Sequence, residues 1–342
     1  MEKVKEIKLL IVDDEYEIID EFKNSIKIYN RENKEIKYKP YIAKSFDEAK
    51  EILETYIIDT AIIDINLDSR GSGNFDGNSV IEEILKYLRV PIFVVSGTPN
   101  HLDDSFKDNA MIKSYTREAD INEKLFERDI PNSIQSSTLA YFSRNGYLES
   151  KVAKFYWEHL SKTIEYWEKV AKEKPQEIDK ILSRHTLSCL NEKLYVNDNI
   201  GKFDKYHPGE MYIIPPIKQH YHTGDIIKKD RELFIILNPA CDIVGQKVEL
   251  YVLAKITSID KNIDNIKLNK GKECYYYLPY FANIFPKIPN NIYIINFQNL
   301  QTTQSCDEYE RVASISSPFL KDIIARFSRY YARQGQPDLM QH

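Results

Sequence analysis

The stretch Lys8-Leu9-Leu10-Ile11-Val12-Asp13-Asp14-Glu15 is an apolar run that ends on adjacent carboxylates. Three later apolar runs, at residues 60–64, 92–97 and 110–113, also end in polar side chains, and helix-like stretches separate the four runs. Apolar strands that alternate with helices predict a doubly wound parallel α/β sheet with both faces covered. We place its strands at residues 7–12, 36–43, 59–64, 91–96 and 110–113.

Five polar side chains lie at these predicted strand ends, namely Asp13, Asp14, Asp64, Ser96 and Lys113. A sheet of this kind carries its functional groups at the carboxyl ends of its strands. Carboxylate and phosphate oxygens are the ligands that Mg2+ prefers. Clustered carboxylates repel one another, so a lysine or a cation must offset their charge. The pattern therefore predicts one site for a hard divalent cation and a phosphoryl group.

These residues, in this order, resemble the receiver domain of two-component response regulators, over about residues 6–128. The resemblance implies a five-stranded, flavodoxin-like fold and a phosphoacceptor carboxylate at Asp64. It also implies Mg2+ as the cofactor, held by Asp14 and Asp64, by Asp13 through water, and by the backbone carbonyl of Asn66. An in-line attack by Asp64 on a phosphoryl donor needs such positive charge.

The resemblance further implies that Ser96 is the switch hydroxyl and that Lys113 pairs with the phosphoryl oxygens. Three features depart from the receiver pattern. Ser114 follows Lys113 where receivers commonly have proline, the loop at residues 65–77 is longer than usual, and the segment from Ser96 to Lys113 is short. The short segment predicts a stunted helix. In the long loop, Arg70 could reach a phosphoryl group, or the loop is simply a mobile Gly/Ser-rich insertion.

The composition limits the class of protein. A length of 342 residues suggests two or three domains, and a net charge of −5 gives no argument for binding nucleic acid or an anionic membrane. No apolar run is long enough to span a membrane, and the charged residues 1–6 are unlike an ordinary signal peptide. The four cysteines are widely spaced and form no metal-type pair. We therefore expect a cytoplasmic protein with free thiols.

The chain is predicted to have three parts: a receiver domain at residues 1–130, a linker and helical connector at 131–200, and a mostly β output or interaction domain at 201–342. Residues 131–137 have the composition of a linker. Apolar side chains spaced by three and four over residues 152–170, and again over 178–189, predict an αα-hairpin. His159 and His185 lie on these apolar stripes, so we expect them to pack within the helices and not to carry phosphoryl groups.

Short β-type runs at residues 211–214, 233–237, 248–256, 275–278 and 291–295 predict a small sandwich or barrel, closed by a helix over 317–331. Residues 223–227, Thr-Gly-Asp-Ile-Ile, with 233–239, faintly resemble the opening of SH3-like barrels. These include the growth-arresting endoribonucleases of toxin–antitoxin modules. The closing helix interleaves arginines with aromatic residues. That pattern fits either packing on the barrel with the arginines in water or contact with a nucleic-acid backbone.

A second set of reactive side chains lies in the predicted β domain, namely His207, His220, His222, Cys241 and Asp242. Histidine and cysteine can hold a metal, and a cysteine beside a histidine can act as a nucleophile. Residues 239–242, Pro-Ala-Cys-Asp, fit equally well a turn with a small buried thiol. The sequence leaves these interpretations open.

Together, the residues and the resemblance predict a response regulator of a bacterial two-component phosphorelay, which accepts a phosphoryl group on Asp64 from a histidine kinase. We expect a regulatory phosphoacceptor and not an enzyme. Three roles for the β domain stay open: an interaction module or phosphate sink that works through a partner effector, a toxin-like nuclease in phage defence, and a DNA-binding transcription regulator. A homodimer is compatible with the sequence, whereas nucleic acid and membranes are not expected partners.

Overall fold

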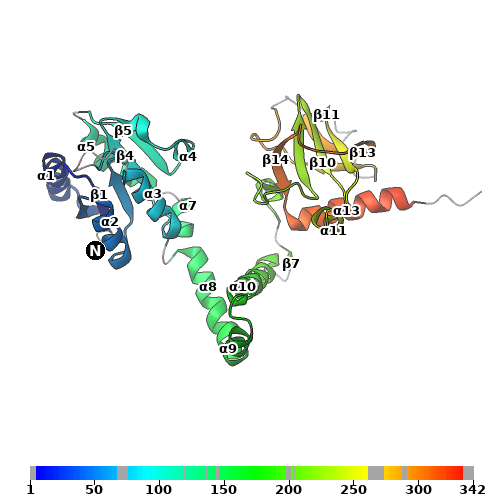
Figure 1. The fold of residues 1–342 in the computed structure, drawn as a ribbon, viewed down its shortest axis with the longest axis horizontal. Helices are drawn as coiled ribbons and strands as arrows, with labels where there is room; N and C mark the ends of the chain where they lie inside the picture. The colour runs from blue at the N-terminus through cyan, green and yellow to red at the C-terminus, as the bar shows by residue number, and fades with distance from the viewer. Residues whose placement is uncertain are drawn as a thin grey trace, which may run out of the picture. The chain divides into compact units, whose positions relative to one another are not determined.

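The computed structural model describes residues 5–67, 76–118, 120–135, 137–143, 146–197, 202–203, 205–260, 273–286 and 291–333. The chain divides into two compact units, Met1–Val196 and Asn197–His342, and each is described by itself (Figure 1). The predicted long loop with Arg70 falls largely at residues 68–75, outside the described residues.

The first unit is built on a five-stranded parallel sheet. Its strands are β1 (Lys5–Val12), β2 (Ile36–Ala43), β3 (Thr60–Ile63), β4 (Ile92–Ser96) and β5 (Ile112–Thr116), in the order β2-β1-β3-β4-β5. This is the doubly wound, flavodoxin-like order, as predicted, with its topological switch point between β1 and β3. Every side chain of β3 and β4 is buried, which explains why both read as unbroken apolar runs.

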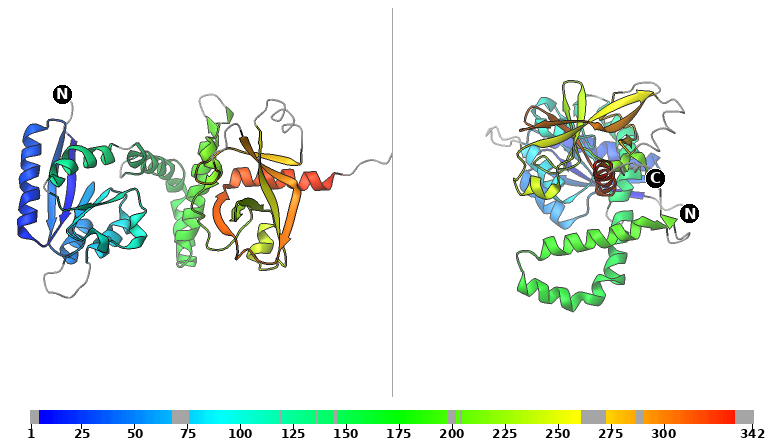
Figure 2. Two further views of the ribbon diagram at one scale, coloured as in Figure 1. Left: turned by 90° about the horizontal axis from the view of Figure 1, so that it is seen from above. Right: turned by 90° about the vertical axis from the view of Figure 1, so that its right-hand side faces the viewer.

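Helices cover both faces of this sheet and form two cores. On one face, Phe22 of α1 (Tyr16–Glu32) packs with Phe126 of the π-helical turn η2 (Lys124–Asp129). Figure 2 shows α1 lying along the side of the sheet. On the other face, Ala49 of α2 (Phe46–Thr55) and Val80 of α3 (Asp76–Tyr87) belong to the second core. The remaining short helices are η1 (Pro99–His101), α4 (Asp104–Lys107), α5 (Ile121–Glu123) and α6 (Ile130–Ile134).

Two sequence predictions about this unit are wrong and one is confirmed. The fifth strand was placed at residues 110–113, but β5 begins at Ile112 and continues to Thr116. It is an edge strand with Lys113 and Ser114 exposed, so it carries no continuous apolar signal. The predicted linker at 131–137 begins inside α6, where Ile130 and Pro131 are buried. The stunted helix is confirmed, because α4 has only 4 residues.

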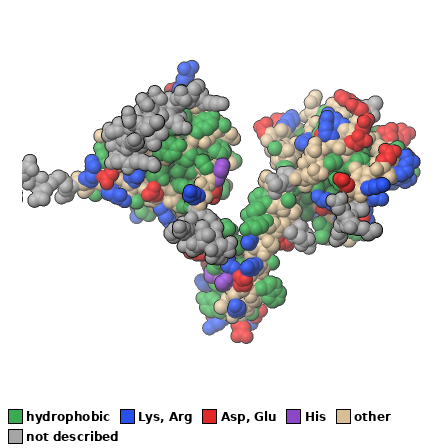
Figure 3. Space-filling view, turned by 180° about the vertical axis from the view of Figure 1, so that it is seen from behind, with side chains coloured by type: hydrophobic (Ala, Val, Ile, Leu, Met, Phe, Trp, Pro, Cys, Tyr) green, Lys and Arg blue, Asp and Glu red, His purple; other side chains and the backbone are tan. Residues whose placement is uncertain are grey.

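A helical arm follows, made of α7 (Ser137–Phe142), α8 (Tyr147–Glu158), η3 (Leu160–Thr163), α9 (Ile164–Glu173) and α10 (Ile178–Tyr195). Of its described side chains, only Phe155 is buried. The ring centroids of His159 and His185 lie 5.7 and 6.3 Å from that of Phe155. His185 is half-buried as predicted, whereas the side chain of His159 is 55% exposed. Other large apolar side chains of the arm, such as Trp157 and Leu187, are exposed. Figure 3 shows hydrophobic side chains on the surface of the arm.

The second unit is a seven-stranded antiparallel sheet in the order β12-β13-β11-β10-β9-β14-β8, closed by helix α13 (Ser317–Ala332). Its strands are β8 (Tyr212–Ile213), β9 (Asp225–Lys229), β10 (Glu232–Ile236), β11 (Tyr251–Asp260), β12 (Tyr275–Leu278), β13 (Asn291–Thr303) and β14 (Glu310–Ile315). Short elements are the pair β6 (Val196–Asn197) and β7 (Lys202–Phe203), with η4 (Pro208–Met211) and α11 (Ala240–Val244). The prediction of a mostly β domain with a closing helix is confirmed, whereas this strand order does not establish an SH3-like barrel.

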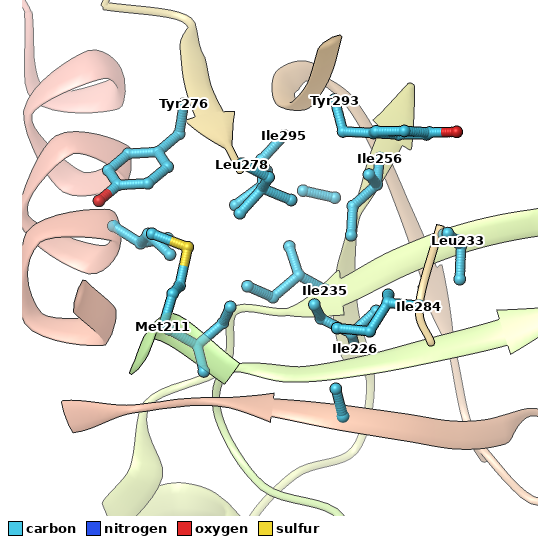
Figure 4. Packing of buried hydrophobic residues seen from close by; sticks show 14 of the residues in the cluster. Met211, Ile226, Leu233, Ile235, Ile256, Tyr276, Leu278, Ile284, Tyr293 and Ile295 are labelled. Carbon is cyan, nitrogen blue, oxygen red and sulfur yellow. The ribbon is translucent and has the colours of Figure 1, made fainter. Parts of the chain in front are cut away.

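The larger of the two cores of this unit includes residues of both the sheet and the closing helix. Ile226, Ile235 and Ile295 converge from three strands, and Met211 and Tyr276 lie on the side of the closing helix (Figure 4). Ile323 of α13 is fully buried in the same core. None of the helices in the described part of the chain is long and apolar enough to cross a membrane.

The segment Thr223-Gly224-Asp225 has a structural role at the start of β9. Gly224 has a φ of +84°, and a Cβ there would lie 2.6 Å from Leu320 of α13, so a side chain would be strained and crowded. Asp225 is 1% exposed, and its carboxylate accepts the Ser314 hydroxyl at 2.5 Å and the His222 N–H at 2.7 Å. Burial raises the pKa of Asp225, although these donors and Arg311 oppose the shift. This segment therefore connects β9 to β14 and packs against the closing helix.

Candidate functional site

The carboxyl end of β1 places two carboxylates side by side. The Asp13 N–H donates to the Ala43 carbonyl at 3.1 Å, so strand pairing continues one residue beyond β1. Asp13 is 2% exposed, and its Oδ1 accepts the Glu15 N–H at 2.9 Å. Asp14 follows and is half-buried. The turn out of the strand thus holds Asp13 inside the sheet edge and leaves Asp14 nearer the surface.

Asp64 enters the same site from the end of β3, the strand next to β1. Its N–H donates to the Val12 carbonyl at 2.9 Å, and its side chain is only 3% exposed. Ligand atoms of Asp13, Asp14 and Asp64 all lie within 4.8 Å of one another. Asp64 Oδ1 is buried without a hydrogen-bond partner. The structure therefore brings together the three carboxylates that the sequence placed at one strand edge.

The cation of this cluster is Arg117, which the sequence analysis missed. The Arg117 N–H donates to the Ser96 carbonyl at 3.3 Å, directly after β5 ends at Thr116. Its Nη2 lies 2.7 Å from Oδ2 of Asp13 and 2.7 Å from Oδ2 of Asp64. Its Nη1 lies 2.6 Å from Oε1 of Glu15. One guanidinium thus pairs with three carboxylates from two strand ends.

Lys113, the predicted partner of the phosphoryl group, does not reach this cluster. It pairs with Phe93 in the sheet, whereas Ser96 pairs with Thr116. Three residues of strand, about 10 Å, therefore separate Lys113 from the carboxyl edge. Its Nζ donates to the Ser133 hydroxyl of α6 at 3.2 Å. The prediction that Lys113 ends the strand was wrong, because β5 continues to Thr116. The sequence signal that points to Arg117 is the polar pair Thr116-Arg117, which follows Tyr115.

Ser96 lies beneath the site at the end of β4 and is fully buried. Its Oγ accepts the Thr98 N–H at 3.3 Å. The Thr98 hydroxyl in turn accepts the side-chain amide of Asn66 at 2.5 Å, and Asn66 Oδ1 lies 3.5 Å from Nδ1 of His101. Side chains therefore connect the loop after β3 to the loop after β4, so a movement at one strand end can reach the other.

Gly77 allows helix α3 to approach the backbone at Asp64. Its N–H donates to the Ile65 carbonyl at 3.3 Å. A Cβ at this position would lie 2.2 Å from the Asp64 carbonyl oxygen and 2.6 Å from Ile65 Cα. Both neighbours are backbone atoms, so no side chain could move aside. The absence of a side chain at Gly77 is thus a condition for the position of Asp64.

The site holds more negative than positive charge. Burial raises the pKa of Asp13 to about 7, against the opposing effects of the Glu15 N–H and Arg117. Burial also raises the pKa of Asp14. The pKa of Arg117 is raised, because its pairing with Glu15, Asp64 and Asp13 outweighs the opposite effect of burial. The site therefore holds four carboxylates and one guanidinium, which pairs with three of them.

This charge excess, an all-oxygen donor set and the unpartnered oxygen of Asp64 fit a hard divalent cation such as Mg2+. Asp13, Asp14 and Asp64 are the side chains that would hold it. The predicted contribution of the Asn66 carbonyl remains a prediction.

The histidines and cysteine of the second unit do not gather in the same way. In the described part of the chain, the acidic cluster above is the one group of three potential metal-binding side chains close enough to share an ion. The ring of His207 accepts the Gly209 N–H at 3.1 Å and caps η4. Cys241 is exposed in α11, and its Sγ lies 3.6 Å from Asp242 Oδ1. The structure therefore gives no support to a metal site there, and the buried thiol of the alternative interpretation is also wrong.

Comparisons with known proteins find solved structures that are similar to about two fifths of this chain. No protein-family model and no curated protein matches the chain. Among solved structures, a CheY-like response regulator receiver domain from Methylobacillus flagellatus is 20% identical, with a TM-score of 0.30, and covers 39% of this chain and 100% of its own. The N-terminal domain of a response regulator/sensory box/GGDEF 3-domain protein from Carboxydothermus hydrogenoformans is 19% identical, with a TM-score of 0.30, and covers 37% and 92%. The first unit has the doubly wound, flavodoxin-like fold that receiver domains share. Its strand order carries this conclusion, and residues 5–134 are called the receiver below.

Proposed function

We propose that the chain is a two-component response regulator that accepts a phosphoryl group on Asp64. The observation that carries the proposal is Asp64 itself, a nearly buried carboxylate at a strand end, with one oxygen unpartnered and the other held by Arg117. Its neighbours are two further carboxylates, and Ser96 ends the adjoining strand β4. This donor set suits a phosphoryl group and a divalent cation better than it suits any organic cofactor.

The chemistry at Asp64 is a phosphoryl transfer from a phosphohistidine of a histidine kinase. An Asp64 oxygen attacks phosphorus, a P–O bond forms, the P–N bond breaks, and the released imidazole nitrogen takes up a proton. Bound Mg2+ would supply positive charge to the phosphoryl oxygens. Arg117 supplies a second, fixed charge, and the main chain at Val12 fixes the Asp64 backbone. Asp64 itself is only 3% exposed, which limits the access of water to its carboxylate.

The phosphorylated state would be read through Ser96 and its contacts. A phosphoryl group on Asp64 adds about two negative charges and new acceptor oxygens. The Ser96 hydroxyl, which now accepts the Thr98 N–H, is a donor for such an oxygen. Its movement would pull on Thr98 and through it on Asn66. We propose this as a regulatory change in a cytoplasmic phosphoprotein, while the role of the second unit stays among the outputs predicted from the sequence.

The proposal is tested with acetyl phosphate and Mg2+ on the full chain, read by intact mass. One phosphoryl group should be added, and hydroxylamine should remove it, as expected for an acyl phosphate. Asp64→Asn should take up none. Asp104→Asn is the matched control, because Asp104 is an exposed receiver carboxylate in α4, and this variant should be labelled like the wild type. Labelling that persists in Asp64→Asn would show that the phosphoacceptor is elsewhere.

A further inference from the structure

Helix α10 of the arm has apolar side chains on two opposite faces. On one face, the ring of His185 packs on Phe155 of α8, with ring centroids 6.3 Å apart. The other face, about 200° away around the helix axis, carries Leu187 and Leu194, which are 66% and 61% exposed, with Leu190 half-buried between them. A helix that is apolar on both faces is normally buried on both. The outer face of α10 is therefore a surface that lacks its partner.

The three leucines of this outer face have the spacing of a coiled-coil seam. Leu190 follows Leu187 by three residues and precedes Leu194 by four, which is the alternation of the a and d positions of a heptad. The same repeat, continued toward the start of α10, places Ser183 at d and Lys180 at a. A single lysine at an a position is a known means of fixing the register of such a pair. The seam therefore extends over residues 180–194, and it suits another helix better than it suits a small molecule.

The charges that flank the seam match between two copies of α10. In this heptad Asp179 is at g and Arg184 is at the next e position. Both side chains are exposed, and neither forms an ion pair with any side chain that the structure describes. In a parallel two-stranded coiled coil, a g residue of one helix pairs with the following e residue of the other. Two copies in this arrangement therefore form the same Asp179–Arg184 pair twice, once on each side of the seam.

We propose that α10 forms a parallel two-stranded coiled coil with α10 of a second copy of the chain, so that the arm is a dimerisation element. Packed along the whole of α10, about 27 Å, two such helices bury on the order of 1,000 Å2 in total, close to the smallest area of a specific interface. We therefore expect a reversible dimer with a Kd of about 1–50 μM. The arms themselves favour self-association, because residues 146–196 hold eight acidic and nine basic side chains and two arms do not repel each other. The proposal does not depend on phosphorylation of Asp64.

The experiment is analytical ultracentrifugation of the full, unphosphorylated chain at about 1–100 μM, a range that spans the expected Kd. The wild type should approach twice the chain mass of 40.2 kDa as the concentration rises. The double variants Leu187→Glu/Leu194→Glu and Leu187→Lys/Leu194→Lys should each weaken the dimer at least about 100-fold, because they place like charges in the seam. An equal mixture of the two variants should dimerise again, because each glutamate then faces a lysine.

Two controls separate the seam from other surfaces. Val244→Glu replaces an apolar side chain of the second unit that is 70% exposed, and it should leave the dimer unchanged. A disulfide tests the orientation of the helices. Ser183→Cys places a thiol at a d position, where a parallel pair brings the two copies together, so oxidation should link the chains. Ser188→Cys, also exposed on α10 but beside the seam, should give no such link.

A wild type that stays monomeric up to about 100 μM would overturn the inference. A dimer that survives in the glutamate variant would overturn it too, because the chains would then associate through another surface. Since Leu187 and Leu194 are exposed, both double variants should unfold at the wild-type temperature by circular dichroism. If folded variants do not dimerise when mixed, the partner of α10 is not a second copy. If the variants do not fold, the disulfide decides, and a failure of Ser183→Cys to link the chains overturns the proposal.

Discussion

Substitution of Gly77 by alanine should damage the site from a position that carries no functional group. The added Cβ would lie 2.2 Å from the Asp64 carbonyl oxygen, whereas ordinary contacts begin near 3.4 Å. The shortfall is about 1 Å, and the atoms it meets belong to the backbone of Asp64 and Ile65. Either α3 or the loop after β3 must therefore move by about that amount.

The cost of this overlap can be estimated from the packing of the receiver. Overpacking that forces backbone shifts destabilises a protein by about 1–3 kcal/mol. For a unit of this size that corresponds to a melting temperature lower by about 3–15 °C. A displacement of the nucleophile by about 1 Å should in addition slow phosphorylation by up to about 100-fold. Far-ultraviolet circular dichroism during heating, and the rate of mass gain with acetyl phosphate, measure the two effects.

Gly97 provides the matched control, since it lies beside Ser96 at the end of the next strand. A Cβ at Gly97 would have no neighbour within 4 Å. Gly97→Ala should therefore be neutral or stabilising by less than about 1 kcal/mol, because alanine restricts the unfolded chain. If Gly77→Ala and Gly97→Ala unfold at the same temperature and are phosphorylated at the same rate, the close approach of α3 to Asp64 is not a determinant of this site.

Two further predictions concern titration and thiol reactivity. Burial raises the pKa of Asp13 from 3.8 to about 7, and a proton on Asp13 competes with a cation. Mn2+ affinity, measured from the electron paramagnetic resonance signal of free Mn2+, should therefore rise with pH through about 7 and then level off. Asp13→Asn should lack this pH dependence. The same shift means that the metal-free protein should lose stability as pH rises through about 7, because the folded state retains a proton that the unfolded chain has already released. Cys306 is 1% exposed and burial raises its pKa to about 11, whereas Cys241 is exposed. Iodoacetamide at about pH 8 should therefore modify Cys241 in the native protein and Cys306 only after denaturation. Peptide mass spectrometry identifies the modified cysteines, and rapid modification of native Cys306 would contradict its burial with Phe234 and Leu253 in the second unit.

Central strands of the receiver were predictable from sequence, and the edge strand was not. β3 and β4 are buried on both faces, so their residues are apolar throughout and their ends are unambiguous. These ends locate Asp64 and Ser96. β5 is paired on one side only, and the residues after Ile112 are mostly exposed. The apolar signal stops at Ile112 while the strand continues to Thr116, and this difference moved the expected cation from Arg117 to Lys113.

The second unit shows the same limit for a different physical reason. The sequence analysis placed no strand at residues 310–315, although β14 pairs there with β9 and β8. Only two of the six side chains of β14 are buried, and the strand includes Arg311 and Ser314, which bind a buried carboxylate. Asp225 supplies that carboxylate, and aspartate is itself a residue typical of turns. In sequence, a strand that is stabilised by polar pairs resembles a loop. The pairing of Ser314 with Asp225 could not be predicted because the two residues are 89 positions apart.

Charge balance connects the missed arginine to the proposed phosphorylation of Asp64. Without metal, the pocket already holds more carboxylate than cation, and a phosphoryl group would add about two negative charges to it. Such a state is unfavourable unless a divalent cation enters and the guanidinium remains nearby. Glu15 satisfies the second condition, because it holds Arg117 at the rim through a different nitrogen from the one that binds Asp13 and Asp64.

Loss of Glu15 should therefore matter little for metal binding and much for the lifetime of the phosphorylated state, since Arg117 would have no anchor at the edge of the site. Glu15→Gln should accordingly leave Mn2+ affinity within about twofold of the wild type and shorten the lifetime of the phosphoryl group on Asp64, as followed by intact mass after removal of acetyl phosphate. An unchanged lifetime would show that Arg117 needs no such anchor to remain beside the phosphoryl group.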